Sequence, residues 1–422
     1  MKKFIKSIFN IFVLTFLYSL ISCSNSLEYD TLGSNYKNIL DSTEHLKNST
    51  KKLIEGVYSV TKGNIQIGDN VVIKIDEKYL SVFSGKNEAF MITLGGVDKD
   101  TNFSFEGYWR YAQTEQRGKV NFSIAKNDGA LSILNGLKPN KIIIKGRIDG
   151  NNLVPTSDLE LTYLRPLYIS KDNFYIVGHR GGGRNSDLHP FSENSIQMIN
   201  FASALGANGV EIDIRLTKDK VPVLYHDENI NQRLTKSPLL VGPISNYTYD
   251  QLLKFGQLVR GEEIPTLEQV LKFIVSKQSI NFVWLDVKIP EEVDTVIALQ
   301  KRFQDSANKI GRKLVILFGL PDEDVYFTYS NNKFRGSLSN SVCELDLDKV
   351  EQINSYAWAP RWTLGTLNTE VEQVHSKNRK AIVWTLDQTD FIVKFLKGGN
   401  FDGILTNYPM TVAYNYYTKI NQ

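Results

Sequence analysis

Two acidic residues alternate with apolar residues in the segment GVEIDIR, residues 209–215. On a β-strand, side chains two positions apart point to the same side, so Glu211 and Asp213 should share one face. Like charges that are close together in a medium of low dielectric must share a proton, pair with cations or bind a metal. A half-exposed strand with solvated acids would show the same alternation, so the prediction of a metal site needs support from elsewhere in the chain.

That support comes from Asp286 in the segment WLDVK, residues 284–288, which adds a third carboxylate after a later apolar run. Three carboxylates suit a hard cation and suit zinc less well. We therefore predict one divalent ion, Ca²⁺ or Mg²⁺, bound by Glu211, Asp213 and Asp286. Lys288 offers a point charge for a phosphate group, and its alternative role is pairing with the acids alone.

Two of the five histidines directly follow segments that we predict as strands. These are His179 and His226, and an imidazole is the usual acid or base near neutral pH. Arg180 adjoins His179 and offers a fork of donors for phosphate oxygens. His189 and His375 are assigned to packed or surface positions.

From residue 169 to residue 422 the chain alternates strand-like and helix-like segments. We predict strands at 174–181, 209–216, 222–227, 282–288, 313–320, 381–386 and 401–406, and helices at 195–205, after 265, at 293–303, 369–377 and 391–396. Alternation over about 250 residues is typical of a (β/α)8 TIM barrel, whose catalytic groups lie at the carboxyl ends of the strands. An open doubly wound sheet is the alternative, but the run of glycines at 181–183 lacks the spacing of a dinucleotide-binding loop.

Residues 51–168 have a different pattern, with short alternating runs separated by Gly, Asn and Asp. This predicts a small antiparallel barrel or sandwich. Its aromatic residues could line a ligand surface, although core packing is the commoner role. They are Phe103, Phe105, Tyr108, Trp109 and Tyr111. No catalytic set occurs in this part, so a ligand for the predicted β domain stays unknown.

The first residues of the chain predict export. Residues 1–22 combine three lysines with a short apolar run and end in Leu20-Ile21-Ser22 before Cys23, which is typical of a signal peptide. The four residues 20–23 resemble a bacterial lipobox, which implies lipidation of Cys23 and a membrane-anchored lipoprotein of the cell envelope. An uncleaved membrane anchor and an ordinary secretory signal are the alternatives. Residues 23–50 are predicted as a polar tether, and Cys343 as a small buried residue.

The charge balance excludes one broad class of function. The chain of 422 residues has 49 basic and 46 acidic side chains, a net charge of +3. This is too balanced for a dedicated nucleic-acid binder, so any anion is expected to bind locally. A chain of this length should also form more than one domain.

Several short motifs occur in an order that resembles the glycerophosphodiester phosphodiesterase family, over residues 176–409. They are His179-Arg180-Gly181, Glu193-Asn194-Ser195, Gly206-Ala207, Glu211-x-Asp213, His226-Asp227, Pro265-Thr266-Leu267-Glu268, Asp286-x-Lys288, Val383-Trp384-Thr385 and Asp402-Gly403-Ile404-x-Thr406-Asn407. The resemblance implies a TIM-barrel enzyme that hydrolyses glycerophosphodiesters to glycerol 3-phosphate and an alcohol.

The resemblance also implies roles for single residues. His179 and His226 would be the acid–base pair, with His179 as the base, and the three carboxylates would bind the metal. The residues implied to bind substrate are Arg180, Lys288, Glu193, Asn194 and Trp384, although Trp384 would equally suit a core. The alternatives are a phospholipase D-like lyase that releases a cyclic phosphate from lyso- or sphingophospholipids, and a membrane-tethered binding protein.

The sequence departs from the family pattern in the loop between His179 and Glu193. This loop is longer and richer in glycine than is usual, and it adds Asn185, Asp187 and His189 near the predicted site. The resemblance therefore leaves the substrate preference open.

Overall fold

The computed structural model of the protein describes residues 41–76, 79–149, 155–170, 173–237, 239–331 and 340–419. The predicted signal peptide, Cys23 and most of the predicted tether lie outside the described residues. No helix in the described ranges combines the length and the apolar character needed to cross a membrane.

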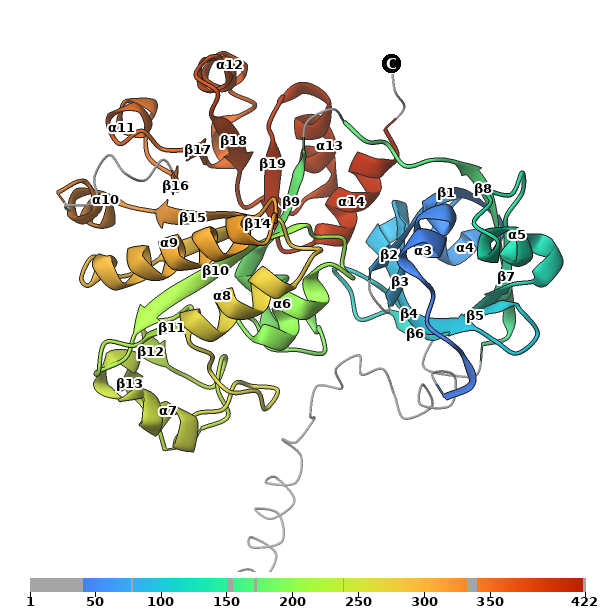
Figure 1. Cartoon of the computed structure of the whole chain (residues 1–422), viewed down its shortest axis with the longest axis horizontal. Coiled ribbons are helices and arrows are strands. Elements are labelled where there is room, and N and C mark those ends of the chain that lie inside the picture. The colour runs from blue at the N-terminus through green and yellow to red at the C-terminus, as the bar shows by residue number, and fades with distance from the viewer. Residues whose placement is uncertain are drawn as a thin grey trace, which may run out of the picture. The chain divides into compact units, whose positions relative to one another are not determined.

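The first part of the described chain is a closed barrel of eight antiparallel strands (Figure 1). The strands are β1 (Gly56–Lys62), β2 (Asn70–Asp76), β3 (Tyr79–Ser84), β4 (Ala89–Val97), β5 (Phe103–Tyr111), β6 (Arg117–Ile124), β7 (Ile143–Ile148) and β8 (Ser157–Arg165). Pairing of β1 with both β2 and β8 closes the barrel. The predicted antiparallel β domain is thus confirmed, in its barrel form.

The predicted aromatic residues of this domain are all buried. Four of them belong to the hydrophobic cluster of the antiparallel barrel, and they are Phe103, Phe105, Trp109 and Tyr111. Tyr108 points to the other side of β5 and belongs to a second cluster. Short helices accompany the barrel: α3 (Asn48–Ile54), α4 (Asn64–Ile67) and α5 (Ala130–Leu134). The end of the predicted tether pairs with the barrel, because Glu44 and Val97 exchange backbone hydrogen bonds of 2.8 Å.

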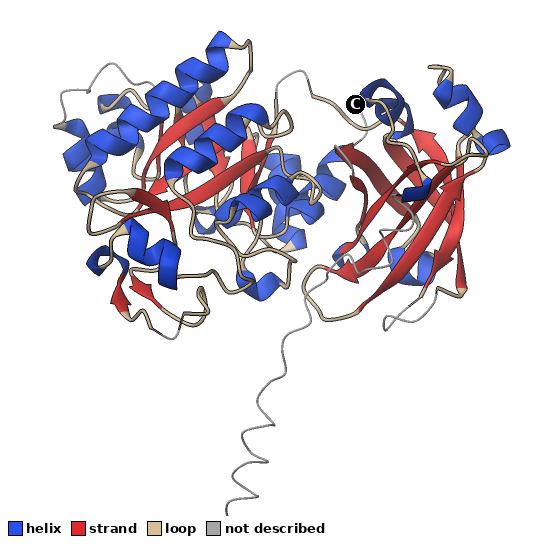
Figure 2. Cartoon of the chain, turned by 60° about the horizontal axis from the view of Figure 1, so that its bottom comes forward, coloured by secondary structure: helices blue, strands red, loops and turns tan. Residues whose placement is uncertain are grey.

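The second part is a closed barrel of parallel strands with helices around it, as Figure 2 shows. Its strands are β9 (Tyr175–Gly178), β10 (Gly209–Leu216), β14 (Phe282–Val287), β15 (Val315–Leu320), β16 (Ser341–Cys343), β17 (Ala357–Trp358), β18 (Lys380–Val383) and β19 (Gly403–Thr406). β9 pairs with both β10 and β19, which closes the ring. The predicted TIM barrel is confirmed.

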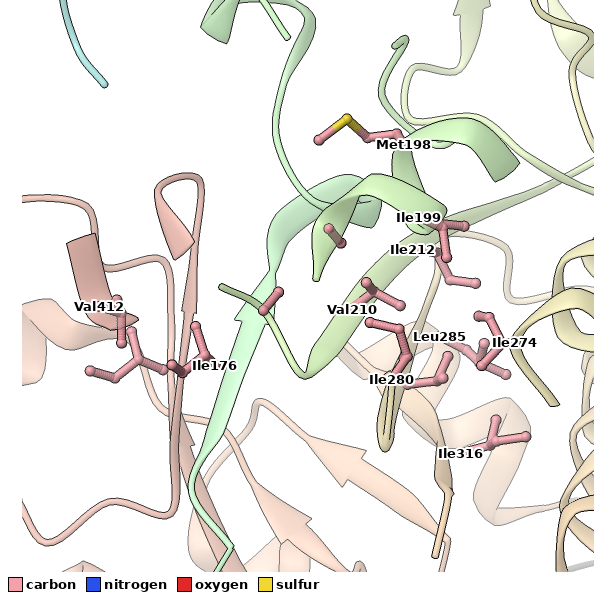
Figure 3. Close-up of a cluster of buried hydrophobic side chains, with 14 of the residues drawn as sticks. Ile176, Met198, Ile199, Val210, Ile212, Ile274, Ile280, Leu285, Ile316 and Val412 are labelled. Atoms are coloured by element: carbon pink, nitrogen blue, oxygen red, sulfur yellow. The ribbon is translucent and has the colours of Figure 1, made fainter. Parts of the chain in front are cut away.

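Helices on the outside of the ring bury one face of each strand. They are α6 (Ile196–Ala202), α8 (Leu267–Ser276), α9 (Val293–Lys309), α10 (Glu323–Ser330), α11 (Leu347–Gln352), α12 (Asn368–Ser376), α13 (Thr389–Gly398) and α14 (Pro409–Tyr417). Figure 3 shows Val210 and Ile212 of β10 in one apolar cluster with Ile199 and Ile274 from α6 and α8. The alternate residues of β10 therefore face the barrel interior, as the sequence predicted.

The interpretation of residues 222–227 as a barrel strand was wrong. β11 (Pro222–Leu224) pairs antiparallel with β10, and the pair forms a hairpin at the edge of the ring. β12 (Asn229–Ile230), β13 (Gly242–Pro243) and α7 (Tyr249–Phe255) follow in a small lobe. The ring is completed instead by β16 and β17. These strands were not predicted because they have only three and two residues.

Candidate active site

Three carboxylates meet inside the parallel barrel. Glu211 and Asp213 lie on β10, and the parallel register sets Asp213 beside Asp286 of β14. Their ligand oxygens all lie within 4.8 Å of one another. Glu211 and Asp213 are fully buried, so the predicted cluster is assembled as expected, in surroundings of low dielectric.

Each carboxylate has one oxygen that accepts a hydrogen bond and one buried oxygen that accepts none, although Asp213 Oδ1 is ion-paired with Lys288 Nζ at 3.0 Å. The accepting oxygens receive hydrogen bonds from the Arg180 backbone N at 2.7 Å, from Asn194 Nδ2 at 2.7 Å and from Lys288 Nζ at 2.6 Å. The oxygens that accept none are Glu211 Oε1, Asp213 Oδ1 and Asp286 Oδ1. A buried carboxylate oxygen that accepts no hydrogen bond is costly, and an oxygen-preferring cation would coordinate all three atoms at once. The donor set therefore fits a divalent ion.

The charges of the cluster point to the same conclusion. Burial and then the charge of Asp213 raise the pKa of Glu211 well above its usual range. Burial would lower the pKa of Lys288, but the neighbouring carboxylates outweigh burial and the net shift is upward. Lys288 Nζ lies 3.0 Å from Asp213 Oδ1 and 2.6 Å from Asp286 Oδ2. One cation among three buried acids leaves the cluster short of positive charge.

His179 follows β9 at the edge of this cluster, and its Nε2 lies 3.8 Å from Glu211 Oε2. Its Nδ1 lies 2.7 Å from Asn407 Oδ1. Asp387 accepts hydrogen bonds from Asn407 Nδ2 at 2.6 Å and Asn407 N at 2.8 Å, which turns the amide oxygen toward the imidazole. Since that oxygen only accepts, Nδ1 carries the proton and Nε2 has the lone pair. Burial and then the charge of Arg180 lower the pKa of His179 to about 4.

Arg180 reaches three parts of the site at once. Its backbone is left-handed, with φ of 54°, which costs a non-glycine residue about 1 to 2 kcal/mol. This conformation lets its N–H donate to Glu211 Oε2 while its guanidinium turns outward. Nη1 donates to Glu193 Oε1 at 2.9 Å, and Nη2 donates to His226 Nε2 at 2.7 Å. Arg180 therefore connects Glu211, which lies beside His179, with His226.

His226 reaches the site by a route that the sequence did not predict. The hairpin returns the chain alongside β10, where the Tyr225 N donates to the Asp213 carbonyl at 3.1 Å. Because Nε2 accepts from Arg180, the ring proton lies on Nδ1, which is 2.6 Å from Asp227 Oδ1. Burial pushes the pKa of Asp227 up, but hydrogen bonds from His226, Asn231 and Arg233 bring it well below its usual range.

The motif Glu193-Asn194-Ser195 contacts the site residues Arg180 and Asp213 through buried side chains. Glu193 is 2% exposed, and its carboxylate is held between Arg180 and Arg233. Asn194 exchanges two hydrogen bonds with Asp213, through Nδ2 at 2.7 Å and Oδ1 at 3.1 Å. Ser195 caps α6 by accepting from the Met198 N. Both side chains are buried and bonded to other residues of the site, and substrate binding by Glu193 and Asn194 stays a prediction.

Comparison with known proteins shows the family of this chain. Residues 179–411 match the model of the glycerophosphoryl diester phosphodiesterase family. A putative glycerophosphodiester phosphodiesterase of Bacillus subtilis is 36% identical over 250 residues, which are 56% of this chain and 95% of the relative. The chain belongs to this family. The family and the enzyme class predicted from the sequence, a phosphoric diester hydrolase, are thereby confirmed.

Two further proteins match over a similar share of this chain. A glycerophosphodiester phosphodiesterase of Caldanaerobacter subterraneus subsp. tengcongensis is 25% identical over 56% of this chain and 95% of the relative. The solved structure of an Oleispira antarctica phosphodiesterase, a complex with the product sn-glycerol-3-phosphate, is 18% identical. That alignment covers 56% of this chain and 94% of the other, with a TM-score of 0.42. The family match begins after the antiparallel barrel, which lies outside it.

Trp384, the remaining predicted residue of the family site, follows β18. Its Nε1 donates to the Ala359 carbonyl at 2.7 Å, and the guanidinium of Arg361 lies 5.0 Å from its ring centre. The ring packs beside the apolar interior of the parallel barrel and is partly exposed. This position suits both a wall of the substrate site and a core residue.

Sequence reasoning missed three acids of this family site. Asp387 orients Asn407, Asp227 orients His226, and Glu344 follows β16, where burial and then the charge of Asp286 raise its pKa. Asp227 and Asn407, the residue that Asp387 orients, were inside the motifs named from the sequence, but no role was assigned to either. Asp387 and Glu344 could have been found as acids that follow barrel strands. For Glu344 this would have required β16 to be predicted first.

His189 and His375 occupy a buried and a partly exposed position, as predicted. His375 Nε2 is 2.8 Å from Asp402 Oδ2, beside a cavity of about 660 Å³ at the amino-terminal ends of β18 and β19. That cavity shares no lining residue with the family site. His189 is 3% exposed under the loop that follows β9. Cys343 is buried, and burial raises the pKa of its thiol to about 12, as suits an unreactive residue.

Proposed function

We propose that this enzyme hydrolyses glycerophosphodiesters to glycerol 3-phosphate and an alcohol, using one divalent ion, Ca²⁺ or Mg²⁺. Glu211, Asp213 and Asp286 would hold the ion, and His179 and His226 would transfer protons. One observation carries the proposal: each carboxylate has a buried oxygen that accepts no hydrogen bond, on three residues whose ligand atoms lie within 4.8 Å of one another and share the charge of Lys288. The family membership supports the choice of substrate class.

The bound ion would supply positive charge that polarises a phosphate oxygen and acidifies the attacking hydroxyl. Arg180 would bind the diester anion, because its guanidinium already extends from the acidic cluster toward His226. Lys288 would add a second positive charge from β14, and its upward-shifted pKa keeps it protonated. These two side chains would hold the phosphate between the histidines.

His179 is suited to be the base. Its pKa of about 4 makes it neutral at neutral pH, and the hydrogen bond to Asn407 leaves the Nε2 lone pair on the side of the carboxylates. There it can take the proton of the nucleophile, either water or the neighbouring glycerol hydroxyl of the substrate. The first choice gives hydrolysis in one step, and the second passes through a cyclic phosphate.

His226 is suited to be the acid. When Arg180 turns from His226 to the phosphate, Nε2 is released to carry a proton toward the leaving alkoxide. Asp227 stays ionised, because its pKa is held low, and it stabilises the protonated ring through Nδ1 at 2.6 Å. The pair Asp227–His226 thus resembles the carboxylate–imidazole pairs of other hydrolases.

A chelated and desalted preparation tests this proposal. Glycerophosphodiesters with different head groups would be incubated with each divalent metal in turn, and the products identified by phosphorus NMR. We expect glycerol 3-phosphate only when Ca²⁺ or Mg²⁺ is restored. His179→Ala and His226→Ala should each lose about 10²-fold or more in kcat and retain the metal by isothermal titration calorimetry, whereas Glu211→Ala should lose both.

Three outcomes would overturn the assignment. Turnover that survives in the double variant His179→Ala plus His226→Ala would remove the acid–base pair from the mechanism. Release of a cyclic phosphate from lysophosphatidylcholine, with no turnover of glycerophosphodiesters, would identify the lyase reaction instead. A chain that binds these compounds without turnover under any metal would be the membrane-tethered binding protein.

We also propose that the enzyme is a lipoprotein of the cell envelope, anchored through Cys23. The support is the sequence of residues 1–23 alone. Metabolic labelling with a radioactive fatty acid should mark the wild-type protein and leave Cys23→Ala unlabelled. Equal labelling of both proteins would refute the anchor.

A further inference from the structure

The outer side of the antiparallel barrel contacts the first β/α unit of the parallel barrel. Tyr79 of β3 packs edge to face against Phe201 of α6, with ring centres 5.5 Å apart. Ser81, on the same strand, donates from its buried hydroxyl to the Ala204 carbonyl at 2.7 Å. Tyr79, Tyr108, Phe201 and Ala204 belong to one hydrophobic cluster, which continues into the helices around β10. The element that follows His179 and Arg180 therefore rests on the other barrel.

Arg110 of β5 extends this contact to the loop before α6. It is 3% exposed, and its Nη1 donates to the carbonyls of Asp187 and Leu188, both at 3.1 Å. Its Nε donates to the Tyr111 carbonyl at 3.2 Å, which ties the guanidinium to its own strand. Leu188 has a left-handed backbone, with φ of 56°. A buried charge thus holds a loop in a conformation that its sequence does not favour.

The same loop holds a side chain of the site. The Asn185 N donates to Glu193 Oε2 at 2.8 Å, and the Glu193 N donates to Asn185 Oδ1 at 3.0 Å. The other oxygen of Glu193 accepts from Arg180 at 2.9 Å. A path of charged or paired hydrogen bonds therefore runs from Arg110 through residues 185–188 and Glu193 to the guanidinium proposed to bind phosphate.

We propose that Arg110 is a positioning residue for phosphate binding, so that the antiparallel barrel forms part of the architecture of the active site. The inference rests on the proposed function. Arg260 holds the loop at Asn185, with hydrogen bonds of 2.7 Å and 2.9 Å, and Arg110 holds it at the carbonyls of Asp187 and Leu188. Loss of the Arg110 contacts would displace the loop that fixes Glu193 and, through Glu193, Arg180. Arg110 and the antiparallel barrel lie outside the residues that match the family model.

Arg110→Met and Arg110→Lys test this role, with Ser81→Ala as the matched control. Methionine keeps the apolar stem and removes the donors, whereas lysine keeps a charge that can reach the carbonyls. Ser81→Ala also removes a buried hydrogen bond between the barrels, but that bond ends on Ala204 and does not reach the loop. All three variants would be compared with the wild type in the full chain.

We expect Arg110→Met to lower kcat/KM about ten- to a hundred-fold, because small displacements of a binding group have effects of this size. Most of the change should be in KM, since Arg180 would bind substrate and transition state alike. Arg110→Lys should recover part of the loss, and Ser81→Ala should keep the wild-type KM. Hydrogen exchange of residues 184–189 should become faster in Arg110→Met and stay unchanged in Ser81→Ala.

Two results would overturn the proposal. One is an unchanged KM in folded Arg110→Met, and the other is an equal change in Arg110→Met and Ser81→Ala. Hydrogen exchange separates this failure from that of the proposed function, because it needs no turnover. If the wild type hydrolyses no glycerophosphodiester but residues 184–189 lose protection only in Arg110→Met, the positioning contact stands and the reaction is wrong.

Discussion

Asp387 determines which nitrogen of His179 faces the reacting groups. It accepts two hydrogen bonds from Asn407 and a third from Thr406 Oγ1 at 3.0 Å. The amide of Asn407 is thereby turned so that its oxygen meets the imidazole. Without this constraint the amide could present its NH₂ group, which would favour the opposite tautomer of His179.

Replacing Asp387 should therefore reduce catalysis with little loss of metal binding. We expect Asp387→Asn to lower kcat about ten- to a hundred-fold, since an incorrect tautomer removes much of the benefit of a general base. The measurement is kcat at saturating substrate, with metal affinity from calorimetry. Asp402→Asn is the matched control, because Asp402 also accepts three hydrogen bonds but lies at the other end of the barrel. Equal kcat in both variants would contradict this role.

Sequence reasoning was most successful for residues whose neighbours along the chain carry the signal. Glu211, Asp213, Asp286 and Lys288 were found by their spacing on strands, and the structure brings them together. Glu193 was predicted to bind substrate; it is buried between Arg180 and Arg233, and that role stays a prediction. A short motif records that a residue matters to a family, but it does not distinguish a group that touches substrate from one that orients such a group.

At the scale of elements, the two faces of β10 affect the stability of the fold in opposite directions. Ile212 is fully buried against the helices, and Glu211 is fully buried with the other acids. A carboxyl whose pKa is raised on folding favours the unfolded state at any pH above its unfolded pKa, where the unfolded chain carries the charge freely. The destabilisation by Glu211 is therefore present at neutral pH and disappears in acid.

Adjacent substitutions on β10 should change stability in opposite directions. In chelator at pH 7, we expect Glu211→Gln to raise the free energy of unfolding by about 1 kcal/mol or more. Ile212→Ala should lower it by about 2 to 5 kcal/mol, because it leaves a cavity. Urea denaturation measures both. With excess Ca²⁺ or Mg²⁺, the wild type should gain stability and become more stable than Glu211→Gln, since only a bound ion makes the Glu211 carboxylate stabilising. Failure of this reversal would argue against a metal at Glu211.

Predicting the elements depended on their length and periodicity. β10 and β14 have eight and six residues, and their patterns identified them directly. β16 and β17 are held by pairing with longer neighbours and have too few residues to show any period. β11 has the apolar content of a barrel strand, so its antiparallel pairing with β10 could not be read from composition. The position of His226 was predicted at the site, but for the wrong structural reason.

At the scale of the molecule, apolar contacts join the two barrels. One hydrophobic cluster includes Phe83, Phe90 and Tyr108 from the antiparallel barrel and Phe201 and Leu205 from the parallel one. The glycine at position 206 has φ of 96°, and an added Cβ there would lie 3.2 Å from the ring of Phe83. The sequence predicted both barrels, but the contact between them involves residues far apart in the chain and gave no local signal.

This shared contact predicts that the barrels unfold together, because a large apolar interface couples the stabilities of two domains. Phe122 lies in the interior of the antiparallel barrel and packs against Phe105 with ring centres 5.6 Å apart. Phe122→Ala should cost about 3 to 5 kcal/mol and lower the temperature of a single transition in differential scanning calorimetry, with activity lost at that same temperature. Phe201→Ala, which removes a ring from the interface, should instead separate the transitions of the two barrels. A wild-type chain that already melts in two steps, or a Phe122→Ala variant that keeps the wild-type temperature for loss of activity, would show that the parallel barrel is stable without its neighbour.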